Sequence, residues 1–200
     1  MTEEAIQAKQ SAQTDLAKVT VALTNPKSPS NVGAVMRAAG CYQVDQVLFT
    51  GKRYAMAAKH GSKKLATDTK KASRIIPLTH VEGFENVKQS LANIPNTAKI
   101  VCVDLVEGAT PLPHFHHPEH AIYVFGPEDG TISQHVIDAA DEVVYVPTIG
   151  CMNLAASVNV LLYDRLAKTE LAKNEAVDAD NELIRQSRDT NNKVKVKVSA

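Results

Sequence analysis

The fold is decided by the stretch Val146-Pro-Thr-Ile-Gly150-Cys-Met-Asn153-Leu-Ala-Ala-Ser-Val-Asn-Val-Leu-Leu-Tyr163-Asp-Arg165. A buried-looking strand runs through Gly150 into a helix that Asn153 can cap, because its side-chain oxygen can accept from a free first-turn amide. The apolar residues of this helix then fall on one face: Leu154, Val158, Leu161 and Leu162. Any strand–glycine–helix connection has this form, but the free amides of the first turn also suit a small polar ligand.

The same alternation of strand and helix extends along most of the chain. β-Branched and apolar runs predict strands at 19–24, 46–49, 74–78, 99–103, 121–125 and 142–146. Helices are predicted at 32–39, 84–91, 133–139 and 153–173. Ser30 or Asn31 is the expected cap of the first helix, and Gly40 its left-handed stop. The order predicts an α/β fold with a mostly parallel sheet and helices on both faces.

Composition indicates one main domain with short appendages. The chain has 200 residues, 44% of them hydrophobic, which is enough for one well-buried core. We expect an N-terminal helical extension at 1–17, the domain at 18–173 and a polar, basic tail at 174–200. The alternating Lys193–Val198 segment suits either an edge strand or an unstructured tail, and the latter is favoured.

Cysteine usage and the N-terminus indicate a cytoplasmic protein. Cys41, Cys102 and Cys151 are odd in number and widely spaced, which is typical of reduced thiols. The acidic N-terminus lacks the apolar region of a secretion signal, and no apolar run reaches the length of a membrane span. We therefore expect no contact with a membrane.

Charge is balanced over the whole chain, with 22 basic and 22 acidic residues, but it is not evenly distributed. Residues 52–74 carry eight Lys or Arg and a single acid, Asp68, whereas 75–142 carry ten acids and two lysines. A solvated loop and a phosphate-contacting surface explain the basic stretch equally well. The candidate RNA-contacting residues are Lys52, Arg53, Lys59, Lys63, Lys64, Lys70 and Lys71.

Several common functional classes are excluded by missing motifs. No glycine-rich dinucleotide fingerprint, P-loop, zinc-protease helix or nucleophile elbow occurs. The histidines between residues 110 and 120 suggest a metal site, but the surrounding prolines prevent a helix from presenting two of them together. A solvated loop is the favoured interpretation of His114, His116, His117 and His120, and no metal is expected.

Three loops follow predicted parallel strands, at the sheet edge where such folds bind ligands. The first contains Asn31, Gly33, Ala34 and Arg37, with Gly33 and Arg37 four residues apart on one helix face. The second contains Gly126, Glu128 and Gly130. The third contains Pro147, Asn153 and Leu154. Taken singly, these are ordinary caps, turns and surface charges.

In this order and spacing the three loops resemble the motifs of the SpoU/TrmH branch of the SPOUT methyltransferases, which methylate ribose 2′-hydroxyls of tRNA or rRNA. The resemblance spans about residues 19–168. It implies a deep C-terminal trefoil knot that binds S-adenosylmethionine. The implied cofactor-binding residues are Gly126, Val146, Ile149, Cys151, Met152 and Leu154. Cys151 departs from the serine that many members carry two residues before the asparagine.

The resemblance also implies roles for four catalytic residues. Arg37 is the matching arginine often described as a general base, but a guanidinium in a protein is effectively never deprotonated and is therefore a poor base. We expect Arg37 to stabilise the forming alkoxide, with the proton passing to phosphate or water. Asn31 and Asn153 are expected to hold the hydroxyl and the loops, and Glu128 to orient Arg37 or Asn31.

Family members are homodimers in which a site can borrow its arginine from the neighbour, so a homodimer is expected here, with Tyr163 and Leu166 left for the partner. The absence of a separate N-terminal RNA-binding domain favours tRNA over rRNA as substrate. A non-catalytic RNA-binding homologue stays open, as does a small α/β protein that binds an unrelated metabolite.

Overall fold

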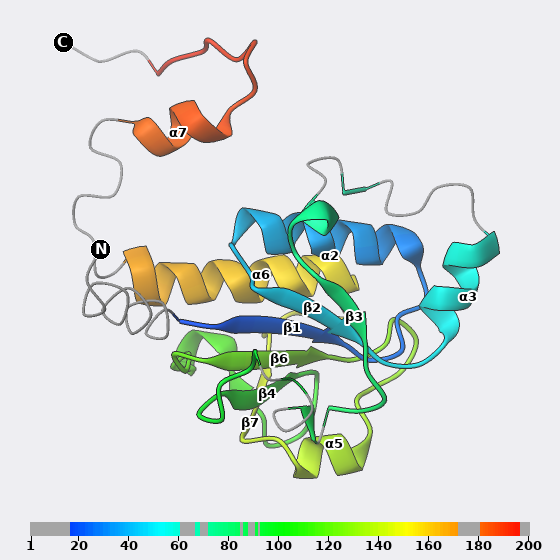
Figure 1. Ribbon diagram of the computed structural model, residues 1–200. Helices are drawn as coiled ribbons and strands as arrows, with labels where there is room; N and C mark the ends of the chain where they lie inside the picture. The colour runs from blue at the N-terminus through cyan, green and yellow to red at the C-terminus, as the bar shows by residue number, and fades with distance from the viewer. Residues whose placement is uncertain are drawn as a thin grey trace, which may run out of the picture.

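The computed structural model describes residues 17–60, 67–68, 72–84, 86–87, 91, 93–171 and 181–196 (Figure 1). The predicted N-terminal extension therefore lies outside the described residues, apart from Ala17. The strands are β1 (Val19–Leu23), β2 (Gln46–Phe49), β3 (Leu78–His80), β4 (Lys99–Val103), β5 (Thr110–Pro111), β6 (Ala121–Phe125) and β7 (Glu142–Tyr145). The α-helices are α2 (Pro29–Cys41), α3 (Arg53–His60), α5 (Gln134–Asp138), α6 (Leu154–Leu166) and α7 (Glu182–Ser187), with short 3-10 helices η1 (Ala72–Arg74) and η2 (Leu112–His114) and a π-helical turn η3 (Ala167–Leu171).

The strands form one sheet in the order β3-β2-β1-β6-β4-β7-β5. Every strand pairing among the described residues is parallel, which confirms the predicted parallel α/β fold. In such a sheet all strands end at the same edge, so the loops after β1, β4, β6 and β7 lie together. The order of the strands thus brings together residues that are about 100 positions apart.

The two faces of the sheet are buried in separate clusters. Along β1, Val21 and Leu23 pack toward α2 and α6, while Ala22 packs into the opposite cluster with Ile132 and Val136. This alternation is the period of two expected of a strand covered on both faces. Figure 1 shows α2 and α6 side by side on one face of the sheet and α5 on the other.

The first helix begins earlier than predicted. Ser28 caps it, since its hydroxyl accepts from the Asn31 amide at 3.4 Å, and Pro29 occupies the first turn. A proline suits that position because its missing N–H has no helical partner there. Ser30 and Asn31 therefore lie inside α2 rather than at its cap. The helix also continues past Gly40 to Cys41, and Gln43 adopts the positive φ of 54°.

Gly40 lies inside α2, at a point where η1 packs close against the helix. A Cβ on Gly40 would stand 2.8 Å from the Cβ of Ala72, which is buried. We expect Gly40→Ala to destabilise the protein by about 1–2 kcal/mol, because the clash exceeds the gain in helix propensity. In an Ala72→Gly background the same change is expected to stabilise by up to about 1 kcal/mol. Urea unfolding of the four variants tests this reversal of sign, and a Gly40→Ala effect that is equal in both backgrounds contradicts it.

Other segments also differ from the predictions. The strand predicted at 74–78 is instead η1 followed by β3, and the proline-rich loop at 110–118 contains the edge strand β5 and η2. The helix predicted at 84–91 falls partly outside the described residues. The predicted helix 153–173 ends as α6 at Leu166, followed by η3, and Lys193–Val196 forms no strand. Among the described residues no helix is long and apolar enough to cross a bilayer.

Candidate active site

A cleft of about 350 Å³ opens at the carboxyl edge of the sheet. Its walls come from the ends of β4, β6 and β7 and from the loop that leads into α6. The lining residues fall into three segments, at 103–105, 125–130 and 146–157. Two of these segments contain motifs that the sequence analysis singled out, so the sheet brings the second and third motif loops to one cavity.

Five of the six predicted cofactor residues line this cleft, namely Gly126, Val146, Cys151, Met152 and Leu154. The sixth, Ile149, is fully exposed and does not belong to the lining. The chain turns outward just before Gly150, whose φ of 86° is left-handed. A glycine is needed for that turn because a Cβ strains such a backbone. The turn leaves Ile149 on the surface of the protomer.

Sequence reasoning missed Asp104, which lies in the cleft directly after β4. Its carboxylate accepts from the Thr131 hydroxyl at 2.7 Å and from the Ile132 amide at 2.8 Å, and so ties the end of β4 to the segment after β6. A Cβ on Gly126 would stand 2.9 Å from Asp104 Oδ2, so the glycine permits this close approach. Asp104 could have been found from the sequence, because it is an acid that directly follows a buried strand, at the edge of the sheet where such folds bind ligands.

The three motifs meet in a chain of side-chain hydrogen bonds. Glu128 accepts from the side-chain amide of Asn31 at 3.2 Å, and the side-chain oxygen of Asn31 accepts from the side-chain amide of Asn153 at 3.1 Å. Asn153 also caps α6 by accepting from the Ala155 amide at 2.9 Å. Residues 97 and 122 positions apart are thereby held within one cluster. The structure thus brings Asn31, Glu128 and Asn153 together, as the sequence predicted.

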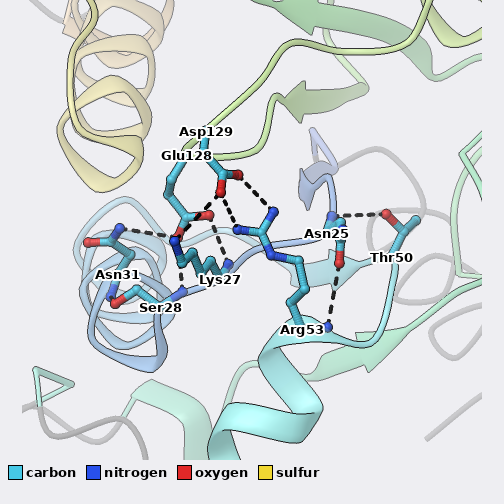
Figure 2. Close-up of polar contacts among 8 residues, drawn as sticks. All are labelled: Asn25, Lys27, Ser28, Asn31, Thr50, Arg53, Glu128 and Asp129. Atoms are coloured by element: carbon cyan, nitrogen blue, oxygen red, sulfur yellow. Dashed lines mark hydrogen bonds and ion pairs between the residues drawn. The ribbon is translucent and has the colours of Figure 1, made fainter.

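The Glu128 carboxylate is held by backbone as well as by Asn31. The Lys27 and Ser28 amides donate to it at 2.8 and 3.1 Å (Figure 2). Partial burial acts to raise the pKa of Glu128, but these two backbone hydrogen bonds and the bond from Asn31 outweigh it and hold the pKa below its ordinary value. The residue is therefore ionised at neutral pH and serves as a fixed acceptor.

This arrangement predicts a specific pH dependence of stability. Because the folded-state pKa of Glu128 lies below 4.5, its stabilising contribution is complete above that pH and is lost as the pH falls through the folded-state pKa. We expect the stability difference between wild type and Glu128→Gln to be constant above about pH 5.5 and to shrink below pH 4.5. Urea unfolding between pH 3 and 7 measures it, and parallel curves throughout that range contradict the assignment.

Arg37 lies apart from this cluster within the protomer. Its side chain is on the exposed side of α2 and is absent from the cleft lining. Of the two predicted partners of Glu128, Arg37 and Asn31, the structure contains the second, since the Glu128 carboxylate accepts from the side-chain amide of Asn31. The positive charge of Arg37 acts on the buried Asp68, whose carboxylate accepts from the Ala72 and Ser73 amides at 2.9 Å.

The structure describes only part of the basic stretch 52–74. Its first part forms α3. Lys52, just before this helix, and Lys59, within it, are exposed, whereas Arg53 pairs with Asp129 at 2.8 Å. Arg53 is therefore engaged by a carboxylate in this structure. The remaining candidate lysines lie outside the described residues: Lys63, Lys64, Lys70 and Lys71.

The prediction of a solvated loop holds for His114 and His116, which are exposed, but not for His117. The side chain of His117 is fully buried, and its ring nitrogens lie 2.7 Å from the Tyr123 hydroxyl and 2.9 Å from Asp164. His120 accepts from the Lys18 amide at 3.0 Å. Burial lowers the pKa of His117 and raises that of Tyr123 to about 12. Within the described ranges no three histidines, cysteines or acids are grouped so as to hold a metal ion.

The fold resembles those of solved structures described as RNA methyltransferases. The SpoU methyltransferase AviRb from Streptomyces viridochromogenes superposes with a TM-score of 0.65 at 20% identity, covering 78% of this chain and 62% of AviRb. Its complex with AdoMet gives a TM-score of 0.63 at 19% identity, over 76% of this chain and 58% of that one. This chain therefore spans about three fifths of the length of AviRb.

Two shorter proteins are covered more completely. The A. aeolicus TrmH/SpoU tRNA modifying enzyme has a TM-score of 0.64 at 16% identity, over 84% of this chain and 85% of that one. A protein whose structure concerns the 2-OH methylation of C/U34 on tRNA has a TM-score of 0.64 at 19% identity, over 79% and 99%. No curated protein matches the sequence significantly.

A sequence model of one family agrees with these structures. The model of the SpoU rRNA Methylase family matches residues 18–163, which include β1, the cleft and most of α6. All three motif loops lie within the matched range. The chain therefore belongs to the SpoU rRNA Methylase family.

Proposed function

We propose that this protein is an S-adenosylmethionine-dependent RNA methyltransferase that modifies a ribose 2′-hydroxyl, with tRNA as its substrate. The observation that carries the proposal is the hydrogen-bonded chain from Glu128 through Asn31 to Asn153 beside the cleft. It joins the three motif loops into one site. Polar groups held this firmly suit the positioning of a substrate hydroxyl next to a bound donor.

The residues of the cleft fit the cofactor. Val103, Phe125 and Leu154 supply apolar walls, and the carboxylate of Asp104 also lines the cleft, where its negative charge favours a cationic ligand. Gly126 leaves room where a side chain would collide. When bound, S-adenosylmethionine supplies an electrophilic methyl group on a sulfonium, which leaves as a neutral thioether.

The chain must then align the ribose oxygen and stabilise the charge that develops on it. We assign this electrostatic role to Arg37, because a guanidinium offers positive charge and several N–H donors in a fixed geometry. The proton of the hydroxyl passes to a phosphate oxygen or to water. Asn31 and Asn153 hold the loops and the hydroxyl, and ionised Glu128 fixes the orientation of Asn31.

Because Arg37 lies outside the cleft of its own protomer, we propose a homodimer in which it completes the site of the partner. Its exposed position on α2 supports this role, as does the neighbouring outer surface of α6, where Val160 and Tyr163 are 38% and 57% exposed. A dimer buries such apolar side chains. We also propose that the C-terminal part of the domain forms the trefoil knot that the resemblance implies.

The choice of tRNA is supported by two neighbours of which this chain covers 85% and 99%, because both are described as acting on tRNA. An rRNA ribose is the alternative, and the name of the family favours it. The exposed Lys52 and Lys59 of the α3 region supply phosphate contacts, which require cations without base-specific geometry.

The experiment compares RNA from a deletion strain and its parent. Purified tRNA and rRNA are digested separately, and 2′-O-methylated nucleosides are quantified by mass spectrometry. We expect one ribose methyl to be missing from the tRNA fraction and restored by the purified protein with S-adenosylmethionine. Loss from the rRNA fraction supports the alternative. No loss in either fraction, together with no cofactor binding by calorimetry, indicates a binder of another metabolite.

A further inference from the structure

A bidentate ion pair connects α3 to the wall of the cleft. Arg53 Nη1 and Nη2 donate to Asp129 Oδ1 and Oδ2, both at 2.8 Å, and Figure 2 shows the two planar groups facing each other. Asp129 is a lining residue of the cleft. Two parallel bonds restrict orientation as well as distance, which a single contact to a lysine does not.

Arg53 is placed by contacts that do not involve Asp129. The Asn25 amide donates to the Thr50 hydroxyl at 3.1 Å, and the side-chain oxygen of Asn25 accepts from the Arg53 amide at 3.5 Å. Gly51, with a φ of 71°, makes room for Asn25, since a Cβ there would stand 2.2 Å from its Oδ1. The first residue of α3 is thus fixed to the loop after β1.

The segment after β6 is held by two adjacent acids. Glu128 binds the loop after β1 through the Lys27 and Ser28 amides, and Asp129 binds the side chain of Arg53. The ammonium of Lys27 adds a longer contact to Asp129 at 3.6 Å. The loops after β1 and β2 therefore both contact the segment that follows β6, and Arg53 links this segment to the loop after β2.

We propose that Arg53 is a positioning residue, which holds segment 127–130 through Asp129 and so sets the wall of the cleft. The consequence for cofactor affinity rests on the function proposed above. The role differs from that of a phosphate contact, which the sequence alone suggested for Arg53. It makes the N-terminus of α3 part of the frame of the cofactor site.

The position of the segment can be tested without any ligand. Hydrogen exchange of amides 128–131 is compared in wild type, Arg53→Ala, Arg53→Lys and Lys99→Ala. Lys99 is the matched control because it forms an ion pair of 2.9 Å with Asp141 at the opposite end of β4. We expect exchange about 2- to 5-fold faster in Arg53→Ala, an intermediate value in Arg53→Lys, and no change in Lys99→Ala.

Cofactor affinity provides the second measurement. Calorimetry with S-adenosylmethionine is expected to give a Kd raised about 2- to 5-fold by Arg53→Ala, and no further by adding Asp129→Ala, because both changes break one pair. Unchanged exchange at 128–131 in Arg53→Ala overturns the inference whatever the cofactor does. If wild type binds no cofactor, the proposed function fails, and the exchange measurement alone decides the role of Arg53.

Discussion

Arg37→Ala is expected to reduce methyl transfer at least about 100-fold while changing cofactor affinity less than about 2-fold. The reason is that Arg37 acts on the charge of the attacking ribose oxygen and does not line the cleft of its own protomer. Single-turnover transfer to RNA measures the first quantity, and calorimetry with S-adenosylmethionine measures the second. Loss of cofactor affinity with an intact transfer rate contradicts the role assigned to Arg37.

A mixing experiment decides which subunit supplies the arginine. Gly126→Val blocks the cleft, because even a Cβ at that position would stand 2.9 Å from Asp104. Heterodimers of Arg37→Ala and Gly126→Val protomers contain one complete site only if Arg37 reaches across the dimer. After subunit exchange between two inactive variants we expect about a quarter of wild-type activity to return. No recovery, with exchange verified by mass spectrometry, means that Arg37 acts within its own chain.

Arg165→Ala is expected to lower the free energy of unfolding by about 3 kcal/mol, the largest stability effect among these predictions. Arg165 is 8% exposed and donates to the carbonyls of Pro118 and Glu119 at 2.6 and 2.7 Å, and to the Tyr123 hydroxyl at 3.0 Å. Its removal takes a charged donor away from two part-buried carbonyls and from the buried Tyr123 hydroxyl, which keeps only its contact with His117 among the described residues. Guanidinium chloride unfolding measures the change.

The matched control for this change is Arg185→Ala, because Arg185 is exposed on α7. We expect it to alter stability by less than about 0.5 kcal/mol. Similar effects of the two substitutions would show that loss of positive charge, and not the buried hydrogen bonds, determines stability.

The sheet and the convergence of motifs were predictable because they depend on local patterns. Continuous apolar runs such as 121–125 indicate strands buried on both faces, and parallel strands end at one edge whatever their order. That rule was enough to place Glu128 near Asn153. The cap of α6 was predictable for the same reason, since Asn153 needs only the amides that follow it.

The predictions failed where contacts distant in sequence decide. Gly40 is a residue type that often ends helices, but here it lies inside α2, where Ala72 packs against it. His117 lies in a proline-rich loop, yet Asp164 and Tyr123 bury it. Arg53 resembles any basic surface residue until Asp129 is placed opposite it. Each of these depends on a partner at least 6 residues away, and most on one far more distant.

The position of β1 inside the sheet has a consequence for synthesis of the protein. β1 lies between β2 and β6, and its pairing with β6 joins Leu23 to Phe125. At translation rates of about 5–20 residues per second, one edge of β1 waits roughly 5–20 s for that partner to leave the ribosome. Nascent chains therefore expose an apolar, unpaired strand edge through much of their elongation, the interval in which chaperones protect such chains from aggregation.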